Sequence, residues 1–220
     1  VNKRQIMITK EGSSDYTDHR GNAHFPNIRQ EVYDMNFQIT EYCHHILEEY
    51  IEEGDICIDA TAGNGGDTEF LCQKVGETGN VYAFDVQEMA IAHTRERLEK
   101  ANLSARAKLI QDGHEKMQTY VKEEAKVIIF NFGYLPGGDH KIATRAATSL
   151  TAIESALNLL KKGGIINLCI YSGGDTGYEE KEAILNYLKT LDSKKWLVIV
   201  NSYFNRKNDP PLPVFIYRLK

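Results

Sequence analysis

The sequence lacks the features that mark membrane, secreted and metal-bound proteins. It has no run of about 18 or more apolar residues, the length that a membrane-spanning helix needs, and residues 1–38 contain no apolar centre of a secretion signal. Its four cysteines show no CxxC spacing. The adjacent pair His44-His45 would point in different directions on a helix, so we predict no metal site there. These absences favour a cytoplasmic protein with reduced thiols and no bound metal.

An excess of positive charge is also missing. The chain has 26 lysines and arginines against 31 aspartates and glutamates, a net charge of −5, so no global basic footprint indicates nucleic-acid binding. An RNA partner would have to be held by local groups. A length of 220 residues with 42% hydrophobic content suits one catalytic domain.

Strand-like and helical segments alternate along most of the chain. The expected strands lie near residues 55–60, 80–85, 107–111, 126–131, 164–171, 196–203 and 213–219. The expected helices lie near residues 36–52, 67–76, 87–101, 114–124, 143–161 and 179–191. This alternation predicts an α/β fold, a Rossmann-like parallel sheet with helices on both faces.

The last connection breaks the alternation. Residues 204–212 are too few for a crossover helix and include Pro210 and Pro211, so the seventh strand should run antiparallel to the sixth. A seven-stranded, mostly parallel sheet with an antiparallel last strand is the layout of class I methyltransferases. We expect residues 36–220 to form this single domain. Residues 1–35 form an extension that either covers the pocket or is disordered.

A glycine-rich turn follows the first strand. The strand ends in Asp59, and A-T-A-G-N-G-G-D-T follows over residues 60–68, where glycines let a ligand approach the main chain. Twenty positions past Gly65 the second strand ends in Asp85, where a ribose-binding acid is expected. Two acids on adjacent strand ends indicate one nucleoside-cofactor pocket.

The residues at the start of the next helix discriminate between cofactors. A dinucleotide fingerprint needs a third small residue at position 68, but this chain has Thr68 there. Asp67 and Glu69 occupy the helix N-terminus and would repel a phosphate held there. S-adenosylmethionine carries no phosphate and is cationic. The acidic lining therefore favours S-adenosylmethionine, with S-adenosylhomocysteine as product, over NAD.

A polar residue ends the fourth strand. Asn131-Phe132-Gly133-Tyr134 resembles the (Asn/Asp)-Pro-Pro-(Tyr/Phe) loop of methyltransferases that act on amino nitrogens, with Phe132-Gly133 in place of the two prolines. An amide oxygen there would orient an amino group, and an aromatic ring would stack on the base. The alternative is a turn in which Asn131 only caps the strand.

Five motifs together resemble the bacterial rRNA methylase family of class I methyltransferases. They are D-A-T-A-G-N-G-G-D-T (59–68), V-Y-A-F-D-V-Q (81–87), Q-D-G-H-E (111–115), N-F-G-Y-L-P-G-G-D-H (131–140) and Y-S-G-G-D-T-G (171–177). Characterised members of that family methylate the 5-aminomethyl group of the wobble thiouridine in tRNA. The resemblance, which covers about residues 36–220, implies the same reaction at the tRNA anticodon region. An rRNA base and a small-molecule N- or O-acceptor stay open as alternatives, as does a homodimer.

The resemblance also implies roles for individual residues. Those expected to bind the cofactor are Asp59, Thr61, Gly63, Asn64, Gly65, Asp67, Thr68, Asp85, Val86, Gln87, Asp112, Gly113, His114 and Asn131. Asn131 and Tyr134 would present the acceptor nitrogen as catalytic residues. Its proton would pass to Asp139, to His140, or directly to water. Asp112 and His114 have a second interpretation, a helix cap with a solvated neighbour.

Substrate contacts are expected on the loops at the same edge of the sheet. They involve Phe132, Gly133, Tyr134, Leu135, Pro136, Tyr171, Gly173, Gly174, Arg206 and Lys207. Arg206 and Lys207 would supply local cations for RNA phosphates. The alternatives are an ordinary glycine-rich connection for Gly173 and Gly174 and a solvated hairpin tip for the two cations.

Overall fold

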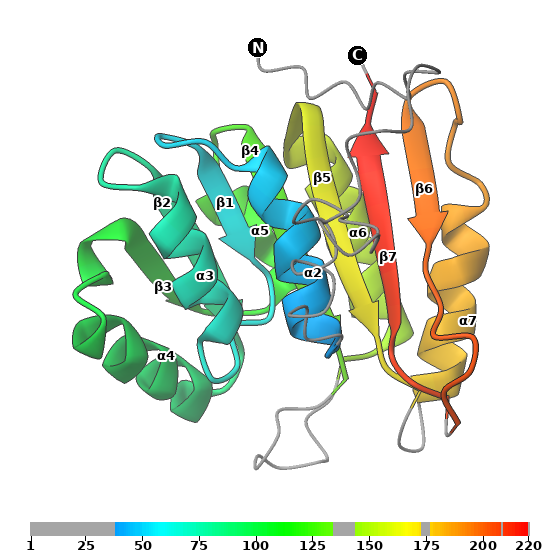
Figure 1. The fold of residues 1–220 in the computed structure, drawn as a ribbon, viewed down its shortest axis with the longest axis horizontal. Helices are drawn as coiled ribbons and strands as arrows, with labels where there is room; N and C mark the ends of the chain where they lie inside the picture. Colours follow the sequence, from blue (N-terminus) through cyan, green and yellow to red (C-terminus); the bar gives the residue numbers. More distant parts are fainter. Residues whose placement is uncertain (1–37, 134–143, 173–176, 208, 220) are drawn as a thin grey trace, which may run out of the picture. The chain divides into compact units, whose positions relative to one another are not determined.

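The computed structural model of the chain describes residues 38–133, 144–172, 177–207 and 209–219 (Figure 1). The described residues from 38 onward belong to one compact unit. The extension predicted for residues 1–35 lies outside the described residues. Among the helices that are described, none combines the length and the apolar character needed to cross a membrane.

Within the described ranges, seven strands form one sheet in the order β3-β2-β1-β4-β5-β7-β6. The strands are β1 (Ile56–Asp59), β2 (Asn80–Asp85), β3 (Ala107–Gln111), β4 (Ala125–Phe132), β5 (Leu160–Ile170), β6 (Trp196–Val200) and β7 (Leu212–Arg218). Neighbouring strands pair in parallel except at β7, which is antiparallel to both β5 and β6. The predicted sheet is therefore confirmed, and β7 lies between β5 and β6.

Helices cover both faces of the sheet, as predicted. On one face lie α2 (Ile39–Leu47), α3 (Gly66–Val75) and α4 (Glu88–Lys100), and on the other α5 (Met117–Tyr120), α6 (Ala146–Leu159) and α7 (Gly177–Leu188). Figure 1 shows α2 and α3 in front of the sheet and α5 and α6 behind it. Short 3₁₀ helices are η1 (Glu48–Tyr50), η2 (Ser104–Arg106) and η3 (His114–Lys116).

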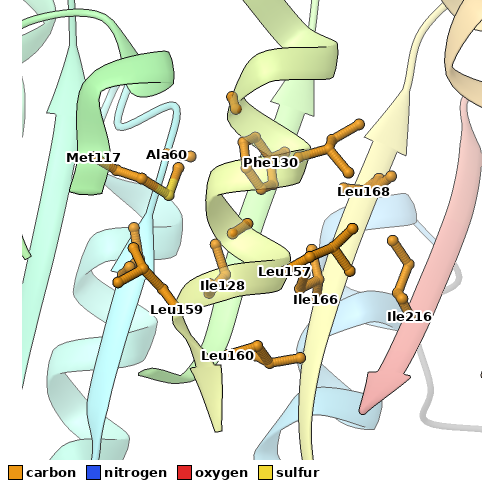
Figure 2. Close-up of a cluster of buried hydrophobic side chains, with 14 of the residues drawn as sticks. Ala60, Met117, Ile128, Phe130, Leu157, Leu159, Leu160, Ile166, Leu168 and Ile216 are labelled. Carbon is orange, nitrogen blue, oxygen red and sulfur yellow. The ribbon is translucent and has the colours of Figure 1, made fainter. Parts of the chain in front are cut away.

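Strand β4 shows how the sequence divides its side chains between these two layers. Successive residues of a strand point to opposite faces, so Ile128, Phe130 and Phe132 join the core beneath α6. Figure 2 shows this core between α6 and strands β4 and β5. Val127 and Ile129 pack on the opposite face, beneath α2 and α3. Asn131 follows them on that face, so its side chain lies on the side of the sheet that α2 and α3 cover.

Several predicted boundaries were wrong. The helix expected over 114–124 ends at Tyr120, because Val121 is extended (φ −101°, ψ 123°) and buried as the chain turns toward β4. The helix expected over 143–161 ends at Leu159, since Leu160 already pairs with Ala125 as the first residue of β5. The strand expected over 196–203 ends at Val200.

The helix expected over 36–52 also differs from the prediction. It is α-helical only to Leu47 and continues as the 3₁₀ helix η1 to Tyr50. For the helices expected over 114–124 and 143–161, tertiary burial or pairing overrides the local preference of the sequence.

Candidate functional site

Four predicted site residues lie on one face of the sheet at the carboxyl ends of their strands. Asp59 and Asp85 end β1 and β2, Asn131 is the penultimate residue of β4, and Tyr171 directly follows β5. Each lies two residues after a core residue of the face that α2, α3 and α4 cover. Those core residues are Cys57, Ala83, Ile129 and Cys169. The two-residue period of a strand thus gathers these side chains above one edge.

The turn between β1 and α3 depends on a glycine. Gly65 has φ +80°, a left-handed conformation, and its N–H donates to the Ala62 carbonyl at 2.8 Å. A Cβ on Gly65 would lie 2.9 Å from the Thr94 Cα of helix α4. Position 65 therefore requires glycine, both for its backbone angle and for the close approach of α4.

Asp85 ties this turn to the end of β2. One carboxylate oxygen accepts the Gly63 N–H at 3.0 Å, and the other accepts the Gln87 N–H at 2.9 Å. A carboxylate oxygen has a second lone pair, so both oxygens can still accept from a hydroxyl group. The arrangement suits the ribose-binding role that the sequence predicted for Asp85 and Gln87.

Asp59 and Thr68 are fully buried, which corrects the expectation that their side chains contact the cofactor. The Asp59 carboxylate accepts the Thr68 hydroxyl at 2.6 Å and the Thr61 N–H at 3.1 Å. Burial, and next the charge of Asp67, raise the pKa of Asp59 to about 7. These two residues hold the glycine turn from beneath.

The raised pKa of Asp59 predicts a pH-dependent stability. The folded state binds the Asp59 proton up to a pH of about 7, whereas the ordinary pKa is 3.8. Its contribution to the free energy of unfolding is therefore fully present below pH 3.8 and is lost as the pH rises toward 7, by at most about 1.4 kcal/mol per pH unit. Urea unfolding of Asp59→Asn without cofactor should lack this decline between pH 5 and pH 7.

Asp112→Asn is the matched control for this measurement. Hydrogen bonds from Lys116, then Tyr120 and the Gly113 N–H, lower the pKa of Asp112 to about 2. Its contribution is present above the ordinary pKa and falls only as the pH drops toward 2. The difference in the free energy of unfolding between wild type and Asp112→Asn should therefore stay constant from pH 5 to pH 8. If the difference in the free energy of unfolding between wild type and Asp59→Asn were equally constant, the raised pKa of Asp59 would be contradicted.

Asp67 joins residues from three elements. It lies in the first turn of α3, and its two carboxylate oxygens contact His44 Nε2 of α2 at 2.5 Å and Asn131 Nδ2 of β4 at 2.6 Å. The main-chain N–H of Asn131 donates to the Thr61 hydroxyl at 2.8 Å. The His44 ring also stacks on Phe70, with 3.8 Å between centroids.

His44, which contacts Asp67, was not among the predicted site residues, because the pair His44-His45 was considered only as a possible metal site. A usable signal was present. His44 stands between Cys43 and Leu47, the two buried residues of α2, so it borders the face of the helix that packs on the sheet.

Asp112 and His114, both predicted to bind the cofactor, differ in their accessibility. The Asp112 carboxylate is partly exposed and accepts from Lys116 at 2.6 Å and Tyr120 at 2.7 Å. His114 is buried, its Nδ1 lies 3.2 Å from the Ala60 carbonyl, and its ring packs edge-on against Phe130. Burial lowers the pKa of His114. His114 is thus neither a solvated neighbour nor a surface ligand, and it supports the end of β1.

Phe132 does not fit the predicted substrate contact. Its side chain is fully buried and stacks on Phe130, with 5.2 Å between centroids, because strand parity directs it into the core beneath α6. Gly133 follows with φ +150°, and the position of a Cβ there would be 3.6 Å from the Tyr171 Cβ. Tyr171 is partly exposed, so Gly133 and Tyr171 form adjacent surface at the mouth of the site.

A buried carboxylate of α7 contacts Thr144 and Ser149. Gly133 and Thr144 exchange two hydrogen bonds, Gly133 N–H to the Thr144 hydroxyl at 2.8 Å and Thr144 N–H to the Gly133 carbonyl at 3.0 Å. Glu180 of α7 accepts from the hydroxyls of Thr144 and Ser149. Burial raises the pKa of Glu180.

The remaining predicted residues fall into two groups. Asn64, Val86, Arg206 and Lys207 are exposed; Asn64 Oδ1 lies 3.1 Å from His93 Nδ1, and the Arg206 guanidinium lies 4.2 Å from the Tyr203 ring centroid. The others lie outside the described residues: Tyr134, Leu135, Pro136, Asp139, His140, Gly173 and Gly174.

Comparison with known families gives two matches. The family described as "Putative rRNA methylase" matches residues 81–217, and the MraW methylase family matches residues 24–134. The two matched ranges overlap over 81–134, which contains most of β2 and all of β3 and β4.

Individual relatives agree with these matches. A chloroplastic tRNA (mnm(5)s(2)U34)-methyltransferase of Arabidopsis thaliana is 38% identical, over 82% of this chain and 69% of its own length. A putative rRNA methylase from Clostridium thermocellum has a crystal structure that is 46% identical, covers 82% of this chain and 97% of its own, and superposes with a TM-score of 0.80. A putative methyltransferase from Streptococcus mutans, solved in complex with S-adenosylhomocysteine, is 41% identical, with 84% and 100% coverage and a TM-score of 0.77.

Proposed function

Because this chain belongs to the putative rRNA methylase family and is an S-adenosylmethionine-dependent methyltransferase, we propose that its acceptor is RNA, most specifically the 5-aminomethyl nitrogen of the wobble uridine in tRNA. The tRNA substrate is supported by the Arabidopsis relative, whose name specifies that position. An amino group as the acceptor is supported by the position of the Asn131 amide. It lies at the carboxyl end of β4, beside the turn between β1 and α3.

The described residues fit the predicted cofactor. The Gly65 turn has no room for a Cβ, and Asp85 keeps lone pairs on both carboxylate oxygens for the ribose hydroxyls. Asp67 in the first turn of α3 disfavours a phosphate, as the sequence indicated. We propose that Gly63 and Gly65 border the methionine end and that Asp85 and Gln87 bind the ribose. When bound, S-adenosylmethionine supplies a methyl group that its sulfonium already activates.

Asn131 would orient the acceptor. Its amide oxygen accepts a hydrogen from the amino group, and the lone pair of the nitrogen is then directed toward the methyl donor. A primary ammonium must first lose a proton, and Asp139 and His140, both outside the described residues, stay the predicted acceptors. Tyr171 and Gly133 provide adjacent surface for the base. The exposed Lys207 and the nearby Arg206 would contact phosphates.

Methyl transfer to defined RNA tests this proposal. The purified protein, with methyl-labelled S-adenosylmethionine, should label tRNA that carries 5-aminomethyl-2-thiouridine at the wobble position. Nucleoside mass spectrometry should find the label on that nucleoside alone. The matched control is the same tRNA with unmodified uridine, which offers no amino nitrogen and should stay unlabelled.

An rRNA acceptor is the second candidate, favoured by the names of the matching rRNA methylase family and of the Clostridium structure. Ribosomal RNA from the same preparation belongs in the same assay. Label in rRNA with none in tRNA would replace the tRNA proposal. Label only in free amines would instead indicate a small-molecule methyltransferase.

A further inference from the structure

We propose that Asp67 and His44 are positioning residues for Asn131: Asp67 fixes the Asn131 amide with its oxygen toward the acceptor, and His44 holds Asp67 in place. This inference rests on the proposed function, since it concerns how the acceptor amine is oriented. It assigns Asp67 a role different from the cofactor contact that the sequence predicted.

The orientation of the amide follows from the chemistry of its partner. A carboxylate has only acceptor oxygens, so the Asn131 group that faces Asp67 Oδ2 at 2.6 Å must be the NH₂. Because the amide is planar, Oδ1 then points away from Asp67. The turned-over amide would place two acceptors in contact at that distance, which is strongly unfavourable.

An amide fixed in this way presents an acceptor oxygen, which suits the N–H of an amine. The reversed amide would instead present its own N–H groups to the N–H groups of the amine, so that donor would face donor. The main chain of Asn131 is also held, by the Thr61 hydroxyl at 2.8 Å. Backbone and side chain are therefore both fixed before a substrate binds, and this is the preorganisation that positioning catalysis needs.

His44 completes the arrangement from α2. Its Nε2 lies 2.5 Å from the second oxygen of Asp67, and its ring stacks on Phe70 of α3. The Asp67 side chain is only 12% exposed and each of its oxygens has a protein partner, so it is poorly placed to contact the methyl donor directly. Both contacts bind Asp67 to its neighbours within the protein.

Single substitutions with separate binding and turnover measurements test the assignment. Asp67→Ala should lower kcat by about tenfold to a hundredfold, the scale of a small misplacement of a reacting group, while S-adenosylhomocysteine affinity by calorimetry changes less than about threefold. His44→Leu should lower kcat by a smaller factor. His45→Leu is the matched control, since His45 is exposed and contacts Glu48 instead, and its kcat should be that of wild type.

A double-mutant cycle separates positioning from general destabilisation. If Asp67 acts through Asn131, Asp67→Ala should cause no further loss of kcat in the Asn131→Ala background. Two independent losses that multiply would overturn the inference. A tenfold weaker S-adenosylhomocysteine affinity with unchanged kcat would overturn it too, because Asp67 would then be a cofactor ligand.

A spectroscopic measurement keeps this test independent of the RNA substrate. In the protein without cofactor, the side-chain NH₂ signals of Asn131, identified by their loss in Asn131→Ala, should shift in Asp67→Ala and stay in place in His45→Leu. Unchanged signals in Asp67→Ala would refute the contact. Failure of the wild-type protein to label any RNA would refute the proposed function while leaving this measurement to decide the orientation of the amide.

Discussion

Replacing Asn131 with alanine is expected to lower kcat for methyl transfer by about a hundredfold to a thousandfold, while the affinity for S-adenosylhomocysteine changes by no more than about threefold. The reason is that Asn131 contributes its amide to the acceptor, whereas its N–H, which alanine retains, bonds the Thr61 hydroxyl. Single-turnover kinetics with the tRNA substrate, together with calorimetry, would measure the two quantities separately.

Asn167→Ala is the matched control for this variant. Asn167 is a buried asparagine of the neighbouring strand β5, on the same face, and its amide donates to the Val214 carbonyl at 3.3 Å. Its loss should lower the melting temperature and leave kcat within about twofold of wild type, because its hydrogen bonds, with Val214, Cys43 and Cys169, do not involve Asn131 or Asp67. Equal effects of the two substitutions on kcat would show that Asn131 has only a structural role.

Gly65→Ala should lose both cofactor binding and stability. Alanine in the left-handed conformation costs about 1–2 kcal/mol, and the Cβ contact of 2.9 Å with the Thr94 Cα forces the turn or α4 to shift. A total loss of about 2–4 kcal/mol in the free energy of unfolding corresponds to a melting temperature lower by roughly 5–15 °C in a protein of this size. The displaced turn should weaken S-adenosylhomocysteine binding by at least about tenfold.

Gly66 provides the control for this prediction. It is the next residue and begins α3, and a Cβ there would meet nothing within 4 Å. Gly66→Ala should therefore leave the melting temperature of the cofactor-free protein unchanged or raise it slightly, since alanine favours the helix. A Gly65→Ala protein with the same melting temperature as wild type would show that the backbone at this turn readily adapts.

Strand parity explains why the sequence could place Asp85 and Asn131 at one edge of the sheet. Asp85 is the last residue and Asn131 the penultimate residue of a strand whose apolar residues alternate between two covered faces, so their strand and their edge follow from the pattern. The same alternation places Phe132 opposite Asn131, and it could have excluded Phe132 from the substrate contacts. The prediction failed there because it considered the N-F-G-Y motif as a loop, whereas Phe132 is still the last residue of β4.

Burial was harder to predict than position. Nothing in the local sequence separates Asp59, which is fully buried, from Asp85, which is partly exposed, because each simply ends an apolar strand. The difference arises from α3, whose Thr68 covers Asp59 with a hydroxyl at 2.6 Å. His114 is similar, since its burial depends on the Phe130 and Ala60 contacts made across the sheet.

The sequence alone determined the class of fold, the antiparallel direction of the last strand and the cationic, phosphate-free cofactor, because these depend on local periodicity, on chain length between strands and on the charge of a single turn. The tertiary structure decided that Asp67 faces Asn131 and that His44 reaches Asp67 from α2. These contacts join residues 44, 67 and 131, which are brought together only when α2 and α3 pack on the same face of β4. Contacts of that kind depend on the packing of whole elements, and no local pattern records them.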